Sequence, residues 1–174
     1  MRIAISGKSG CGNTTVSRMV ADSLGFEMIN FTFRNLSEEK GIDFWTFCTL
    51  AEQSDEYDLE VDRRQTEMAL AEENCVLGSR LAIWMLKEAD LKVYLTATTE
   101  ERARRITERE GGAYQKRLEQ TQMRDANDSA RYKRLYGIDN SDTSVADLVI
   151  DTTTMQPQEV AAIIVREATK RETE

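Results

Sequence analysis

The sequence predicts an α/β protein in which a five-stranded parallel sheet carries helices on both faces. Short apolar segments, too brief for helices, alternate with longer segments of helical spacing, and a glycine-rich loop follows the first apolar segment. A parallel sheet needs such a crossover between successive strands. The expected strands are residues 2–6, 26–30, 75–77, 91–95 and 148–150. The expected helices begin at Thr14 and Pro157 and occupy 31–40, 44–51, 57–74, 99–110 and 113–136.

The length and composition indicate one globular domain. A chain of 174 residues, 31% charged and 40% hydrophobic, is large enough to bury a core of its own. No apolar run approaches the ~20 residues of a membrane span, and the chain opens on no leader-like segment, so we expect a cytoplasmic protein. Since neither a coiled-coil repeat nor an apolar surface stripe is present, we expect a monomer.

The absence of histidine narrows the possible chemistry. It excludes serine–histidine–aspartate triads, cysteine–histidine pairs and histidine-ligated zinc. Cys11, Cys48 and Cys75 are scattered, without the paired spacing of a metal site or disulfide. Catalysis would therefore depend on carboxylates, guanidinium and ammonium groups, hydroxyls and a bound metal. Phosphoryl transfer fits this set because it needs positioning and charge more than a strong base.

Positive charge is concentrated in one region of an acidic chain. The formal net charge is −8, yet residues 100–136 contain ten Lys and Arg against seven Asp and Glu. A general polynucleotide-binding protein usually shows a broad basic surface. This distribution instead favours a small polyanion bound at one place.

A phosphate-binding loop is predicted between the first strand and the first helix. The octet from Gly7 to Thr14 matches G-x-x-x-x-G-K-[ST] except at Asn13. Its glycines let successive N–H groups point inward, and the helix N-terminus adds partial positive charge. The hydroxyl of Thr14 is placed for a magnesium ion on the nucleotide. The expected nucleotide-binding residues are Gly7, Lys8, Ser9, Gly10, Cys11, Gly12, Asn13, Thr14 and Thr15.

Asn13 stands where this motif has its lysine. An asparagine can donate a hydrogen bond to phosphate, but it brings no charge to the β- and γ-oxygens. Lys8, at the second position of the loop, is a candidate for the missing cation. The alternative is that Lys8 is an exposed, solvated side chain.

Four segments are expected to meet at one edge of the sheet. In parallel sheets, ligands bind beyond the carboxyl ends of the strands. The segments that follow the first four predicted strands are Gly7–Thr14, Asn30–Arg34, Gly78–Arg80 and the arginine-rich helices of residues 100–136. Arg34 and Arg80 are therefore stronger candidates for anion contacts than arginines in the middle of helices.

Several sequence blocks make the chain resemble the nucleoside monophosphate kinases, and closely the archaeal-type cytidylate kinases. The most specific are the glycine-rich loop and Asp62-Arg63-Arg64-Gln65. The resemblance covers nearly the whole chain. It implies a single P-loop kinase domain with acceptor-binding helices at about 31–74 and a mobile lid at about 100–136. The remaining blocks are Phe33-Arg34, Tyr57–Val61, Arg80–Met85, Ala89–Val93, Arg131-Tyr132, Tyr136–Asp139 and Asp147–Ile150.

The resemblance implies phosphoryl transfer from Mg-ATP to CMP or dCMP, with Mg2+ as the cofactor. Arg34 and Arg80 would bind the acceptor phosphate, since guanidinium groups form bidentate contacts with phosphate. Asp62 and Arg63 would shape the nucleoside side. The ionised acceptor oxygen needs no general base.

The resemblance also assigns roles to the arginine-rich region. Arg124, Asp128 and Arg131 resemble the R-x-x-x-D-x-x-R pattern of cytidylate kinase lids, and Arg80, Arg124, Arg131 and Lys8 would carry the catalytic charge. The alternative for the lid triplet is an ion-pair ladder within one helix. Arg102, Arg105 and Arg109 share a helix face and either reach the ATP phosphates or line the lid.

One further departure keeps other functions open. The family usually has an acidic residue and then glycine before Arg80, whereas this chain has Gly78-Ser79. That acid would help to hold magnesium-bound water. The alternatives to a cytidylate kinase are a catalytically weakened nucleotide-binding protein of the same fold and a P-loop kinase for another acceptor. The acceptor would then be UMP, AMP or a metabolite alcohol with Asp62 as the base.

Overall fold

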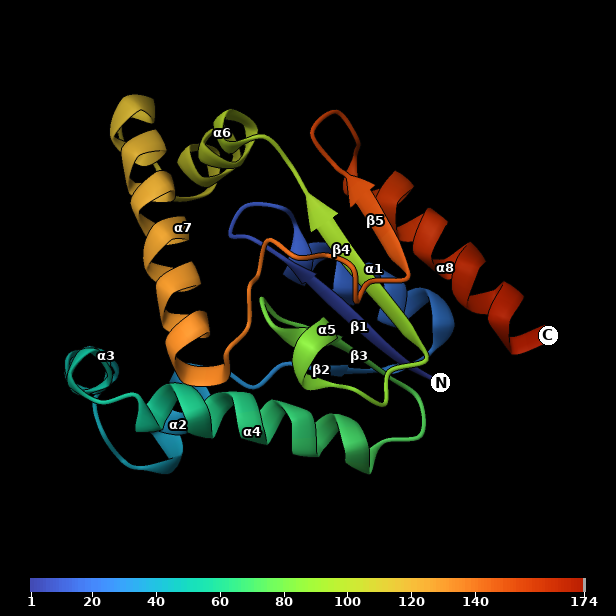
Figure 1. The fold of residues 1–174 in the computed structure, drawn as a ribbon, viewed down its shortest axis with the longest axis horizontal. Helices are drawn as coiled ribbons and strands as arrows, with labels where there is room; N and C mark the ends of the chain where they lie inside the picture. The colour runs from blue at the N-terminus through green and yellow to red at the C-terminus, as the bar shows by residue number, and fades with distance from the viewer. Residues whose placement is uncertain (174) are drawn as a thin grey trace.

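The sheet has the predicted five parallel strands. The computed structural model describes residues 1–173, apart from the side chains of Trp45, Cys48, Ala51 and Glu52. The strand order is β2-β3-β1-β4-β5, and every neighbouring pair is parallel (Figure 1). The strands are β1 (Arg2–Gly7), β2 (Glu27–Ile29), β3 (Cys75–Gly78), β4 (Leu91–Thr96) and β5 (Leu148–Asp151).

Strand β1 lies at the centre of the sheet and fixes where the first loop emerges. Ile3, Ala4 and Ile5 are fully buried, as the continuous apolar run predicts for a strand covered on both faces. Ile3 is in register with Val76 of β3 and with Leu91 of β4. The glycine-rich loop therefore leaves the middle of the carboxyl edge, between neighbours on both sides.

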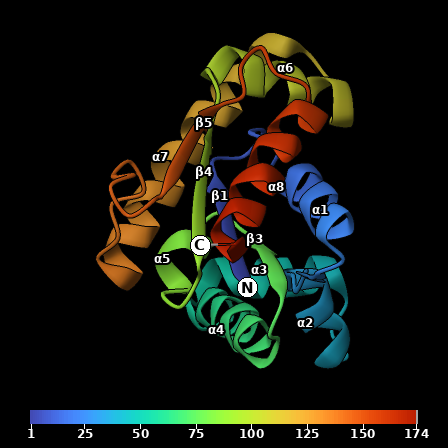
Figure 2. The same cartoon turned by 90° about the vertical axis from the view of Figure 1, so that its right-hand side faces the viewer.

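Helices cover both faces of the sheet, as predicted. Helices α1 (Asn13–Leu24) and α8 (Pro157–Thr173) pack on one face, where Val16, Val20 and Ile164 join the larger core cluster. Helices α4 (Glu56–Ala71) and α5 (Ala82–Met85) pack on the other, through Ala69 and Ile83. Figure 2 shows α1 and α8 on one side of the strands and α5 on the other.

Helix α5 was not among the expected elements. Its four residues, Ala82–Met85, are too few to establish a helical period in the sequence. It is placed by its neighbours, because the N–H of Ile83 donates to the buried hydroxyl of Ser6 in β1 at 3.1 Å.

Two groups of helices extend from the sheet. Helices α2 (Phe33–Glu39), α3 (Phe44–Gln53) and the first part of α4 enclose a small separate cluster of Phe31, Leu36, Phe47 and Val61. Helices α6 (Thr99–Glu110) and α7 (Tyr114–Tyr136) form an arm beyond β4 (Figure 1). No helix of the described residues is both long and apolar enough to span a membrane.

Candidate active site

A cavity of about 830 Å³ lies at the carboxyl edge of the sheet, where the sequence predicts a ligand site. All four segments expected to converge there contribute to its wall, from the glycine-rich loop, the loop after β2, the loop after β3 and helices α6 and α7. Helix α4 and the loop between β5 and α8 complete the wall. The structure therefore confirms the convergence of distant segments that the strand ends imply.

The glycine-rich loop has the conformation that its glycines permit. Gly10 and Gly12 have φ of 86° and 100°, in the left-handed region that side chains disfavour. Residues Lys8 to Thr15 line the cavity, and Gly7 does not. Cys11 is 2% exposed, and burial raises the pKa of its thiol to about 11, so this cysteine fills space beneath the loop and is not a reactive thiolate.

Asn13 closes the loop. Its Nδ2 donates to the carbonyl oxygen of Gly7 at 2.6 Å, across the base of the loop. One of the two N–H donors of this amide is thereby engaged within the loop. Asn13 therefore stabilises the loop from within, and the loop lacks a cation at this position.

A buried arginine joins the glycine-rich loop to the arm. Arg102 of α6 is 2% exposed and donates to the carbonyl oxygen of Ser9 at 3.1 Å. Its two terminal nitrogens also bind the carboxylate of Asp125 in α7 at 3.0 and 2.6 Å. The Lys8 ammonium lies 3.8 Å from the same carboxylate, beyond hydrogen-bond distance. The sequence leaves two interpretations of Arg102, that it reaches the ATP phosphates or that it lines the lid. The structure supports the second, because the side chain is buried and both terminal nitrogens already bind protein groups.

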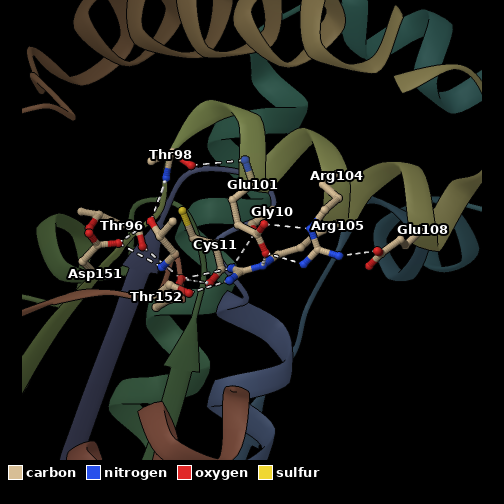
Figure 3. Close-up of polar contacts among 11 residues, drawn as sticks. Gly10, Cys11, Thr96, Thr98, Glu101, Arg104, Arg105, Glu108, Asp151 and Thr152 are labelled. Carbon is tan, nitrogen blue, oxygen red and sulfur yellow. Dashed lines mark hydrogen bonds and ion pairs between the residues drawn. The ribbon is translucent and has the colours of Figure 1, made fainter. Parts of the chain in front are cut away.

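Arg105 makes a second connection between the arm and the loops (Figure 3). Its guanidinium donates to the carbonyl oxygen of Gly10 at 3.3 Å and to the hydroxyl of Thr152 at 3.1 Å. Thr152 is 2% exposed, and its hydroxyl also contacts the carbonyl oxygens of Cys11 and Thr96. Three segments distant in sequence therefore meet at one hydroxyl of a residue that itself lines the cavity.

A second group of arginines surrounds Asp128. This carboxylate is 8% exposed and accepts hydrogen bonds from Arg80 at 2.6 Å and from Arg131 at 3.2 Å. Arg80 and Arg131 line the cavity, whereas Asp128 lies behind them. Since each guanidinium has five N–H donors, most of their donors remain for an anion. The Asp128–Arg131 pair is one rung of the predicted ion-pair ladder.

Arg124 is the third member of the predicted triplet, and it does not join the ladder. It is exposed and makes no hydrogen bond or ion pair with the described residues. Desolvation and the positive charge of nearby Arg80 lower the pKa of its guanidinium. The negative charges of Asp128 and Glu110 act in the opposite direction. Arg124 does not itself line the cavity.

Of the residues predicted to bind the acceptor, some line the cavity and others do not. Asp62 lines the cavity, and the hydroxyl of Tyr136 donates to its Oδ2 at 2.6 Å. Arg63 points elsewhere and pairs with Glu67 in the same helix. The Arg34 guanidinium lies 4.1 Å from the centre of the Phe44 ring. Neither Arg34 nor Arg63 is part of the cavity wall formed by the described residues.

One part of the wall is not among the segments expected from the sequence. Residues 152–157, from the end of β5 to the first residue of α8, line the cavity, as do Gln65 of α4 and Tyr132 of α7. The strand-end rule applied to the fifth strand would have found residues 152–157. Gln65 carries no such signal, because its role depends on a contact with the carbonyl oxygen of Phe31, 34 residues away.

Packing explains why residue 78 is glycine and not an acid. A Cβ atom at Gly78 would lie 2.2 Å from the hydroxyl oxygen of Ser17 and 2.7 Å from its Cβ. Ser17 is fully buried in α1, so it has no room to move away. The side chain of Ser17 therefore occupies the space that an acidic residue at position 78 would need.

We expect Gly78→Ala to lower the free energy of unfolding by about 1–3 kcal/mol, the usual cost of overpacking a filled core. Urea denaturation measures the change. Ser17→Gly removes both clashing atoms, so the same Gly78→Ala substitution in a Ser17→Gly background should cost less than about 0.5 kcal/mol, because the two positions are coupled. An equal cost in both backgrounds would show that Ser17 does not limit position 78.

Known proteins provide an independent comparison. Residues 2–154 match the model of the cytidylate kinase-like family. The "Cytidylate kinase 2" of Borrelia garinii subsp. bavariensis is 48% identical over 175 residues, covering 98% of both chains. The "Cytidylate kinase" of Pyrococcus horikoshii is 41% identical over 164 residues, covering 93% of this chain and 85% of that protein. These matches confirm the resemblance to the archaeal-type enzymes.

Solved structures support the fold. Shikimate kinase from Acinetobacter baumannii has a TM-score of 0.66 at 18% identity, covering 99% of this chain and 95% of that one. Deoxyadenosine kinase from M. mycoides has a TM-score of 0.57 at 16% identity, with 98% and 100% covered. At these identities the likeness concerns the fold alone. The family match and the relatives over nearly the full length go further: the chain belongs to the cytidylate kinase-like family.

Proposed function

We propose that this protein is a nucleoside monophosphate kinase that transfers the γ-phosphoryl group of ATP to CMP or dCMP. The observation that carries the proposal is a single cavity that joins a phosphate-binding loop to the arginine pair Arg80 and Arg131. The named cytidylate kinases, 41–49% identical over most of their length, support the same reaction.

The two ends of the cavity suit the two substrates. The backbone N–H groups of the glycine-rich loop and the N-terminus of α1 favour the phosphates of ATP. Arg80 and Arg131 offer unoccupied guanidinium donors to the phosphate of the acceptor. An acceptor oxygen that is already ionised attacks in line, and these cations stabilise the charge spread over the transferred group.

Mg2+ fits this site as a companion of the nucleotide. The described residues contain no group of three acidic or cysteine side chains that could hold a metal alone. Thr14 lies in the first turn of α1, is exposed and lines the cavity, so its hydroxyl can provide one ligand. Mg2+ commonly takes one or two protein ligands and completes its shell with phosphates and water. It would neutralise charge on the β- and γ-oxygens.

The arm of α6 and α7 acts as the lid of this enzyme, and α2–α4 act as the acceptor-binding helices. Arg102 and Arg105 link the arm to the loops on the ATP side, and Tyr136 links it to α4 on the acceptor side. A lid connected to both sides can exclude water while both nucleotides are bound, which prevents hydrolysis of ATP. Arg34, Arg63 and Arg124 reach the substrates only if they move.

Lys8 supplies the cation that the loop lacks at Asn13. Five arginines line the cavity in the described structure, and each donates a hydrogen bond to a carboxylate: Arg80, Arg104, Arg105, Arg109 and Arg131. The ammonium of Lys8 lies 3.8 Å from the carboxylate of Asp125, and the Lys8 side chain is 37% exposed. It is therefore the cavity cation that can move to a phosphate at least cost.

The protein acts as a cytoplasmic monomer on free nucleotides. Its net charge of −8 disfavours polynucleotides, since their binding depends on many contacts between basic residues and phosphates. Positive charge gathered around one cavity suits a small, highly charged ligand.

The experiment that tests the function measures ADP release from Mg-ATP. The acceptors are CMP, dCMP, UMP, AMP and GMP, each compared with a reaction without acceptor. We expect turnover of about 1 s⁻¹ or more with CMP and dCMP, within the usual range of enzymes. Faster turnover with UMP or AMP would assign another acceptor. ATP binding without turnover for any acceptor would show a nucleotide-binding protein that has lost catalysis.

Lys8→Met should lower kcat by about 10²–10³-fold, the effect of removing one group that stabilises transition-state charge. The KM for CMP should change little, because Lys8 lies at the ATP end. The matched control is Lys87→Met, which removes an exposed lysine outside the cavity wall. A Lys8→Met variant with unchanged kcat would show that Lys8 is only a solvated side chain.

A further inference from the structure

A second, much smaller cavity lies between the glycine-rich loop, β4 and α7. Its volume is about 10 Å³, and its wall includes two residues that also line the main cavity, Lys8 and Arg80. Two carboxylates of α7, those of Asp125 and Asp128, line only the smaller of these cavities. They are three residues apart, so they share one face of the helix. Lys8 and Arg80 therefore border the main cavity on one side and carboxylates of α7 on the other.

The two cations differ in how closely they approach these carboxylates. Arg80 donates to Asp128 at 2.6 Å, whereas Nζ of Lys8 lies 3.8 Å from Oδ2 of Asp125. The longer distance does not allow a hydrogen bond, but it is short enough for a direct attraction between the charges. Salt screens this attraction less than it screens surface pairs, because the Asp125 side chain is only 17% exposed. Lys8 is therefore attracted by Asp125 without being bound to it.

Arg102 explains why Asp125 stays at this distance. Its two terminal nitrogens donate to the two oxygens of Asp125, at 3.0 Å to Oδ1 and at 2.6 Å to Oδ2. This bidentate contact fixes the orientation of the carboxylate. The same guanidinium donates to the carbonyl oxygen of Ser9, the residue that follows Lys8 in the loop. Asp125 is therefore held at a defined place relative to the backbone that carries Lys8.

We propose that Asp125 is the positioning residue of Lys8, and that Arg102 keeps Asp125 from capturing the ammonium. This inference deepens the proposed function and rests on it for the role of Lys8. The ammonium of a lysine sits on a flexible four-carbon stem, and a fixed carboxylate nearby limits the positions that it samples. Since Asp125 forms no hydrogen bond with Lys8, the ammonium can move to a phosphate without breaking one.

The inference connects the positive charge of the loop to the lid. Asp125 belongs to α7, whereas Lys8 lies in the loop that follows β1. The carboxylate is close to Lys8 only while α7 lies against this loop. The ammonium is therefore best placed when the lid is closed over ATP. This order suits a kinase, which must avoid transferring the phosphoryl group to water.

The alternative is that Asp125 serves only as the counterion of Arg102. Arg102 is 2% exposed and needs a carboxylate partner in either case. A counterion alone would make the effect of a substitution at Asp125 independent of Lys8. The coupling between Asp125 and Lys8 therefore separates the two roles.

The test is a double-mutant cycle on the full chain, in which titration calorimetry measures the affinity for Mg-ATP without acceptor. Asp125→Asn removes the negative charge and keeps an oxygen for Arg102. We expect it to weaken Mg-ATP by about fivefold in the unaltered chain and by less than about 1.5-fold in a Lys8→Met background. The matched control is Glu119→Gln, which removes an exposed carboxylate of α7 outside both cavities. It should leave the affinity unchanged in either background.

A second variant guards against loss of the fold, since Asp125→Asn leaves Arg102 with a weaker partner. Arg102→Met combined with Asp125→Leu replaces the whole pair by apolar side chains, an exchange that often costs little stability. This double variant should also weaken Mg-ATP, and Lys8→Met should then have a smaller effect on the affinity than in the unaltered chain. Loss of the contact with Ser9 is common to both backgrounds, so the comparison cancels it. Thermal unfolding verifies that each variant is folded.

Turnover gives a second readout that a merely structural role would not produce. Asp125→Asn should lower kcat by about tenfold and leave the KM for CMP nearly unchanged, because Lys8 acts at the ATP end and on the transferred group. A structural defect would change both constants.

Three results would overturn the inference: an equal loss of Mg-ATP affinity with and without Lys8, no loss at all, or tighter binding in Asp125→Asn. The last would show that Asp125 restrains Lys8 instead of positioning it. The proposed function fails separately. A chain that shows the coupling between Asp125 and Lys8 in its Mg-ATP affinity, and yet releases no ADP with any acceptor, would retain the positioned lysine and lack the kinase reaction.

Discussion

The buried guanidinium of Arg102 is the interaction on which the arrangement of the cavity depends. It connects α6, α7 and the glycine-rich loop through Asp125 and the carbonyl oxygen of Ser9. A charge at 2% exposure is very unfavourable without such partners, so the three segments keep one relative position. A Cβ at Gly10 would lie 2.9 Å from the Cβ of Arg102, so only glycine allows this close approach. The wall on the ATP side is therefore held by contacts within the protein, with Arg102 at their centre.

This constraint gives α7 a connecting role. Near its middle, Asp125 joins it to the glycine-rich loop, and at its end Tyr136 joins it to α4. One helix of 23 residues thus sets the distance between the two ends of the cavity. Gly111 and Gly112, which the sequence marks as a break between the arginine-rich helices, both have positive φ. They turn the chain from α6 to α7, and Arg102 holds the two helices together beyond the turn.

The sequence predicted the sheet and the place of the site, because both depend on local patterns. The apolar run of Ile3–Ile5 and the glycines after it are visible without knowledge of any partner. The role of Asn13, the exclusion of an acid at Gly78 and the pairing of Tyr136 with Asp62 depend on contacts in the folded chain. The last two join residues 61 and 74 positions apart. For Arg34, in contrast, the sequence pattern predicts a contact that the structure does not contain. Its position after a strand predicts a place in the cavity wall, yet it stacks on Phe44.

The two departures from the family pattern have a common physical basis. The related kinases are expected to place charge at both positions, whereas this chain uses the space for internal contacts. Asn13 makes the hydrogen bond that closes the loop, and the side chain of Ser17 fills the space next to Gly78. In-line phosphoryl transfer requires positive charge near the transferred group, but it does not require that charge to come from one particular position in the loop. Lys8 and the Arg80–Arg131 pair lie in the wall of the same cavity. The charge balance that the reaction needs is therefore available from neighbouring positions, and the loss of a motif lysine is not by itself a reason to expect an inactive protein.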